Sequence, residues 1–141
     1  MYSFIKRLFQ YLVLPRAVRQ GTLPTSADGA AALAITLTAA AAWTFGAWTQ
    51  IALAAVLTTE TQIVGFTLEN FVMAAGAQGE VEIGTGVAPA GALLGRYPIV
   101  GADGVIGPIS VPAATGVVAR LRTSTGVADT VDIKLKTKTG M

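Results

Sequence analysis

Residues 117–135, VVARLRTSTGVADTVDIKL, contain the two most regular alternations of apolar and polar residues in the chain. Residues 117–122 place two arginines opposite a face of valine, alanine and leucine, and residues 131–136 place aspartate and two lysines opposite valine, isoleucine and leucine. Successive side chains of a strand point to opposite faces, so this period of two predicts two half-buried strands. The Ser124–Gly126 segment between them predicts a hairpin turn.

Weaker strand signals come earlier in the chain. Apolar and polar residues alternate over 33–38, 50–53 and 80–83, and residues 62–68 form a β-branched and aromatic run. In that run, every second residue from Val64 is expected on one face.

Many short strands separated by turn residues are typical of a β-sandwich or barrel. The dipeptide Asp103-Gly104 predicts one of the tight turns. With about eight strands in view, we expect an all-β fold, a jelly-roll-like antiparallel β-sandwich over residues 30–141.

The first 29 residues are expected to form a separate N-terminal arm. Residues 2–14 have apolar residues at helical spacing and predict a short amphipathic helix that ends at Pro15, and residues 16–29 predict an irregular linker. The arm is basic, and it either packs on its own domain or docks on a neighbouring subunit. The residues expected to bind a partner are Ile5, Lys6, Arg7, Leu8, Phe9, Leu12, Arg16 and Arg19.

Composition argues against an enzyme. The chain has no cysteine and no histidine, which removes the commonest general base, the Ser-His and Cys-His pairs and the usual zinc ligands. Neither a cofactor nor a metal is expected. Only 13% of the residues are charged and the net charge is +2, so the predicted surface is unusually neutral and suited to contacts with other proteins.

Three groups of residues could carry chemistry or binding. Glu80 and Glu82 project from one strand face and could form an acid/base pair or a calcium site, but we interpret them as a solvated face. Asp129 and Asp132 are expected to be neutralised by Lys134 and Arg122 across strands. Of the aromatic residues at 43, 45 and 48, two are expected to be buried.

A membrane helix is the main structural alternative, because no charge occurs between Asp28 and Glu60. The period-two pattern within this stretch favours strands instead. We therefore expect no membrane association, and the modest number of basic residues argues against specific nucleic-acid binding.

Four segments carry a resemblance to known proteins. WTFGAWTQIAL (43–53), TQIVGFTLEN (61–70), QGEVEIGTG (78–86) and VPAATGVVARLRTSTGVADTVDIKL (111–135) together resemble small virion proteins of tailed bacteriophages and prophages. The resemblance covers residues 30–135 and leaves the N-terminal arm out.

The resemblance implies a head decoration or cement protein, a structural virion protein that stabilises the capsid by bridging subunits of the major capsid protein. It would lie on the capsid exterior, be present in the host cytoplasm during assembly, and act as a homo-oligomer, a dimer or a trimer. The first alternative is a tail, fibre or receptor-binding module that uses exposed aromatic residues. The second, ranked lower, is a small membrane-spanning protein.

Overall fold

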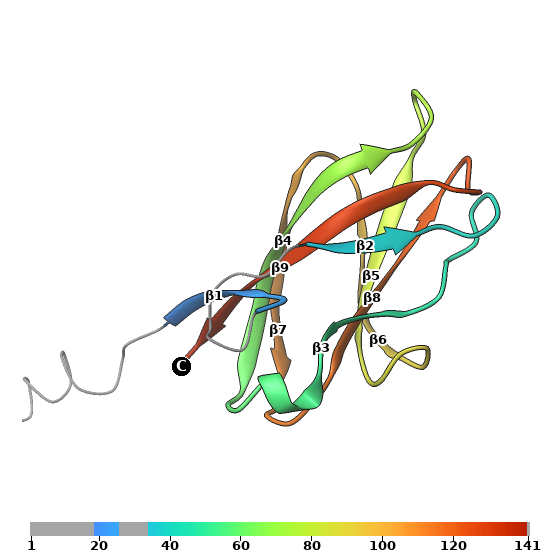
Figure 1. Ribbon diagram of the computed structural model, residues 1–141. Coiled ribbons are helices and arrows are strands. Elements are labelled where there is room, and N and C mark those ends of the chain that lie inside the picture. The colour runs from blue at the N-terminus through green and yellow to red at the C-terminus, as the bar shows by residue number, and fades with distance from the viewer. Residues whose placement is uncertain (1–18, 26–33, 141) are drawn as a thin grey trace, which may run out of the picture.

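The computed structural model describes residues 19–25 and 34–140 (Figure 1). These residues form nine strands and one short 3₁₀ helix, η1. In chain order the elements are β1 (Arg19–Leu23), β2 (Ile35–Thr38), β3 (Thr49–Ala52), η1 (Ala54–Val56), β4 (Thr61–Val72), β5 (Gly79–Thr85), β6 (Ala92–Pro98), β7 (Asp103–Val111), β8 (Val117–Thr123) and β9 (Thr130–Thr139).

The strands form two antiparallel sheets that pack face to face (Figure 1). One sheet has the order β1-β9-β4-β7, with β2 also paired to β9, and the other has the order β3-β8-β5-β6. From β2 onward, the first strand pairs with the last, β3 with β8, β4 with β7 and β5 with β6. This nested pairing is a jelly roll, so the predicted fold class is confirmed.

Alternate residues of the strands fill the core between the sheets. Val131, Ile133 and Leu135 of β9 and Val117 and Leu121 of β8 are fully buried, as their alternation predicts. Their intervening residues lie on the outer faces. Burial of this apolar surface is the main favourable term for folding.

The predicted hairpin between β8 and β9 is wrong. The two strands lie in different sheets, and the connection at residues 124–129 crosses from one sheet to the other. A turn sequence marks where the chain reverses, but it does not determine which strand becomes the hydrogen-bonded neighbour. Asp103-Gly104 likewise begins β7, and the bend precedes it at residues 101–102.

A bulge in β4 changes its predicted face. The pairing of β4 with both β7 and β9 shifts between Ile63 and Gly65, so Val64 falls out of the alternation. Ile63, Phe66 and Leu68 are buried in the core, whereas Val64 is only half-buried. The prediction for Phe66 and Leu68 is confirmed, and that for Val64 is wrong.

The linker prediction is wrong at Arg19–Leu23, which forms β1 and pairs with residues 135–139 of β9. Its sequence is rich in glycine and polar residues, and the edge of β9 supplies the backbone partners that stabilise it. The predicted helix over 2–14 and the predicted boundary between residues 29 and 30 lie outside the described residues. Within the described part of the chain, no helix is long and apolar enough to cross a membrane.

The inter-strand connections gather at two opposite ends of the sandwich. The connections β2–β3, β4–β5, β6–β7 and β8–β9 lie at one end, here called the four-loop end: residues 39–48, 73–78, 99–102 and 124–129 (Figure 1). Backbone hydrogen bonds tie this end together, from Ser124 N to Gln78 O at 2.8 Å and from Ala39 N to Asp129 O at 2.9 Å. β1 begins and β9 ends at the opposite end.

Gly46 tests how tightly the β2–β3 connection packs. A Cβ atom here would lie 1.9 Å from the backbone carbonyl oxygen of Thr38, which cannot move without shifting β2. We expect Gly46→Ala to lower the free energy of unfolding in urea by about 1–3 kcal/mol. Gly107→Ala is the matched control, because nothing lies within 4 Å of its added Cβ. An equal loss in both variants would contradict the packing described.

Candidate functional site

A network of carboxylates and guanidinium groups lies on the outer face of the β3-β8-β5-β6 sheet. Glu82 of β5 is fully buried and accepts hydrogen bonds on both oxygens: Oε1 from Arg96 Nη2 at 2.6 Å and Oε2 from Arg120 Nε at 2.8 Å. Glu80 Oε2 accepts from Arg122 Nη2 at 2.6 Å. Hydrogen bonds between an ionised donor and an ionised acceptor, such as these, are among the stronger hydrogen bonds in proteins.

The interpretation of Glu80 and Glu82 as a solvated face is wrong for Glu82. The strand register places Arg120 and Arg96 on either side of Glu82, and their guanidinium groups occupy both of its oxygens. A buried carboxylate is tolerable only with such partners. Arg122 is likewise engaged by Glu80 and is not available to the aspartates that were expected to bind it.

Aromatic rings from the β2–β3 connection interleave with the arginines of β8. Gly46 N donates to Leu121 O at 2.9 Å and Trp43 N to Thr123 O at 2.7 Å, so the connection runs alongside β8. The stacked side chains form the arginine–aromatic ladder, in the order Trp48, Arg120, Phe45, Arg122, Trp43. From one member to the next, the guanidinium-to-ring distances are 4.2, 4.8, 4.7 and 5.6 Å.

The three aromatic residues differ in exposure. Trp48 is buried against Gly84 and Gly91, where a Cβ would lie 3.0 and 2.7 Å from its ring. Phe45 is half-buried and Trp43 is 46% exposed. Two buried rings were expected, and one, that of Trp48, is fully buried. The indole that is exposed to a partner or receptor is that of Trp43.

Asp129 anchors the β8–β9 connection. Its Oδ2 accepts hydrogen bonds from the hydroxyls of Thr123, at 2.6 Å, and Thr125, and the N–H of Gly126 donates to Thr123 Oγ1 at 2.8 Å. These donors favour the ionised form, so they hold the pKa of Asp129 below its usual range.

Asp132 is also served by neutral donors. It accepts from Thr36 Oγ1 at 2.6 Å and from Asn70 Nδ2 at 2.8 Å, which lower its pKa. The expected pairing of Asp129 and Asp132 with Lys134 and Arg122 is wrong. Hydroxyl and amide groups from neighbouring strands and turns occupy these carboxylates instead.

Exposed apolar residues collect at the four-loop end. The large ones in or beside its connections are Trp43, Phe71, Val72, Val100 and Val127. The only charged residue within these connections is Asp129, whose side chain is buried. The exposed carboxylates nearest to these connections are Glu69 of β4 and Asp103 at the start of β7. A cluster of exposed apolar residues on a folded domain is typical of a protein-binding site.

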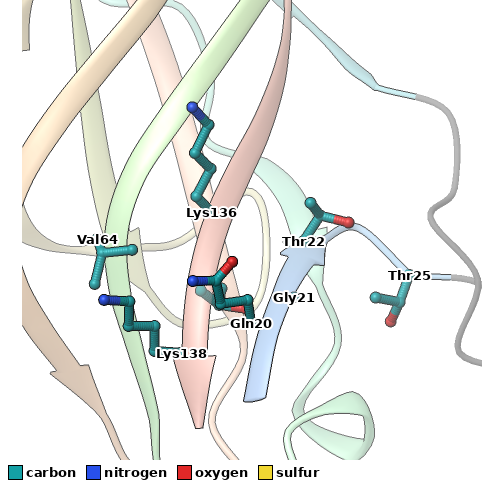
Figure 2. A pocket seen from close by; sticks show the side chains of 8 residues that line it. Gln20, Gly21, Thr22, Thr25, Val64, Lys136 and Lys138 are labelled. Carbon is teal, nitrogen blue, oxygen red and sulfur yellow. The ribbon is translucent and has the colours of Figure 1, made fainter. Parts of the chain in front are cut away.

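A separate groove of about 520 Å³ lies over the outer face of the other sheet (Figure 2). Lys136 and Lys138 of β9, Gln20 and Thr22 of β1 and Val64 line it. The lysines could attract an anion, but Lys136 Nζ lies 3.3 Å from an Asp103 carboxylate oxygen that offsets its charge. Among the described residues, Lys138 is then the one lining cation without an ion-pair partner, so the groove offers a single positive charge.

Of the predicted partner-binding residues, only Arg19 lies in the described part of the chain. It is exposed at the start of β1 and borders a groove with Val56 and Thr59, away from the four-loop end. Residues 5–9, 12 and 16 lie outside the described residues. Sequence reasoning missed the four-loop end. Uncharged connections also occur at the opposite end, at residues 86–91 and 112–116, and the sequence alone does not show which connections share an end.

The fold and the surface together define a jelly-roll β-sandwich with exposed apolar residues gathered at one end. Within the described residues, no three acidic side chains come close enough to hold a metal ion. Comparisons with protein-family models, curated proteins and solved structures found no match to the chain.

The burial of Glu82 predicts a large effect of neutralising it. Glu82→Gln leaves Arg96 and Arg120 without their carboxylate, and we expect the free energy of unfolding to fall by about 3 kcal/mol. Urea denaturation followed by circular dichroism measures the change. Glu69→Gln, at an exposed position of β4, is the control and should change stability by less than about 0.5 kcal/mol. A loss for Glu82→Gln as small as the control's would contradict the network.

The hydrogen bonds of Asp129 predict acid sensitivity. Because its folded-state pKa lies below the ordinary value of 3.8, ionised Asp129 contributes stability above that pH, and the contribution is lost as pH falls through the folded-state pKa. Asp103 and Asp132 shift in the same direction. We expect the urea concentration at half-unfolding to decrease as the pH is lowered beneath 3.8. The decrease should be smaller in Asp129→Asn, which has no carboxylate to protonate at this position. Identical pH profiles for the two proteins would refute this role.

Proposed function

We propose that this protein is a non-enzymatic structural module that binds another protein subunit through its four-loop end. The observation that carries the proposal is the collection of exposed apolar side chains at that end, in connections with no exposed charge. Such a surface loses little solvation of charged groups on binding and gains from removing apolar area from water. The partner surface is therefore expected to be mainly apolar where it contacts these side chains.

Rigidity supports the same proposal. The connections are joined by backbone hydrogen bonds, Asp129 holds the β8–β9 connection, and the arginine–aromatic ladder fixes the β2–β3 connection against β8. A surface that is already ordered loses less conformational entropy when it binds. This suits a role in a stable assembly.

The sequence resemblance indicates which assembly this is. We propose a virion of a tailed bacteriophage, with the major capsid protein as partner and the jelly roll as a decoration or cement protein on the capsid exterior. β1 begins at the opposite end of the sandwich. We propose that the N-terminal arm makes a second contact with a neighbouring subunit. A homo-oligomer, a dimer or a trimer, stays part of the proposal.

Capsid binding tests the proposal directly. Purified protein is mixed with undecorated capsids of the bacteriophage or prophage that encodes it, and the particles are imaged and the bound protein quantified. We expect ordered density with the four-loop end facing the shell. Absence of bound protein, or density with that end facing solvent, would refute the proposal.

Matched variants locate the contact. Val100→Ser combined with Val127→Ser removes two exposed valines from the four-loop end, and each should weaken binding about tenfold if its side chain is buried in the interface. Val87→Ser combined with Val105→Ser removes two equally exposed valines elsewhere and should bind like the parent. An equal loss in both double variants would mean that the four-loop end is not the contact.

A further inference from the structure

Trp43 is the last member of the arginine–aromatic ladder and is stacked differently from the inner members. Arg120 lies between the rings of Trp48 and Phe45, and Arg122 lies between Phe45 and Trp43. Among the described residues, Arg122 is the only cation over the ring of Trp43. One face of the ring is therefore occupied by Arg122, and Trp43 as a whole stays 46% exposed at the four-loop end.

The backbone holds Trp43 in this position at a cost. Its φ of 55° lies in the left-handed region, which bulky residues rarely adopt. The hydrogen bond from Trp43 N to Thr123 O and the stacking on Arg122 offset that cost. Strained residues of this kind cluster at ligand-binding and active sites. An exposed indole that is already ordered has the properties of an interface anchor.

The electrostatics of the ladder favour one kind of ligand on the exposed ring surface. Aromatic faces attract cations. Along the ladder, each aromatic ring before the last is followed by a guanidinium group stacked on its face. Arg122 does not repel a second cation strongly, because Glu80 pairs with it at 2.6 Å. No exposed carboxylate lies within the four connections. Of the exposed carboxylates beside them, Asp103 is engaged by Lys136 and Glu69 projects from β4, so we expect an arriving arginine to be paired with a carboxylate of its own protein.

We propose that Trp43 receives an arginine side chain of the partner protein, which continues the ladder by one further member and is paired with a carboxylate of that same partner. This inference rests on the proposed function, because it names the chemistry that the four-loop end recognises. The apolar residues around Trp43 supply contact area and hence affinity. The stacked arginine supplies specificity, because only a partner that has an arginine at this place can make the contact. Indole–guanidinium contacts are common centres of binding energy in protein interfaces.

The test uses argininamide and its neutral isostere citrullinamide as probes of the folded protein. The chain has two tryptophans, so a ¹H–¹⁵N spectrum contains two indole signals, which Trp43→Asn assigns. Asparagine tolerates a positive φ, so this variant removes the indole without adding backbone strain. We expect argininamide to shift the Trp43 signal about threefold more than citrullinamide at equal concentration. The signal of buried Trp48 should not move with either probe.

Equal shifts with the two probes, or no shift with either, would overturn the inference. Capsid binding separates its failure from that of the proposed function. If Trp43→Leu, which keeps an apolar side chain, binds capsids as well as the parent, the arginine contact is refuted while apolar docking stands. If argininamide is preferred but the protein does not bind capsids, the ligand preference stands and the capsid function is refuted. Loss of capsid binding in Trp43→Leu, with unfolding unchanged in urea, supports both.

Discussion

The buried carboxylate of Glu82 is the constraint on which the outer face of the β3-β8-β5-β6 sheet depends. A fully buried charge is costly unless it is paired, and here Arg96 from β6 and Arg120 from β8 supply the partners from the two neighbouring strands. Because Arg120 is held by Glu82, its planar face is presented to Trp48 and Phe45. One ion-pair network thus fixes three strands and the connection that covers them.

This arrangement links the interior of the sandwich to its binding surface. The ladder runs from buried Trp48 to exposed Trp43, so the order of the sheet face extends to the four-loop end. Asp129 adds a second anchor. Its backbone oxygen accepts a hydrogen bond from Ala39, and its carboxylate accepts from Thr123 at the end of β8 and from Thr125 of its own connection. The apolar end is therefore built from connections that hold one another in place through hydrogen bonds.

Several parts of the fold could be predicted because they depend on local pattern. The alternation at residues 131–136 placed Val131, Ile133 and Leu135 in the core, and all three are fully buried. Prediction failed where a distant strand decides the outcome. Val64 left its predicted face because a bulge in β4 is set by pairing with β7 and β9, and Arg19–Leu23 became a strand because the edge of β9 was available to it.

The candidate site divides in the same way. By itself the sequence determined the class, an all-β sandwich with a neutral surface and no histidine or cysteine, because composition and a period of two are properties of the chain alone. Only the tertiary structure decided that Glu82 is buried, that Trp43 is the exposed indole and that the uncharged connections share one end. Those outcomes depend on which strands become neighbours, and strand order is set by packing between segments far apart in the chain.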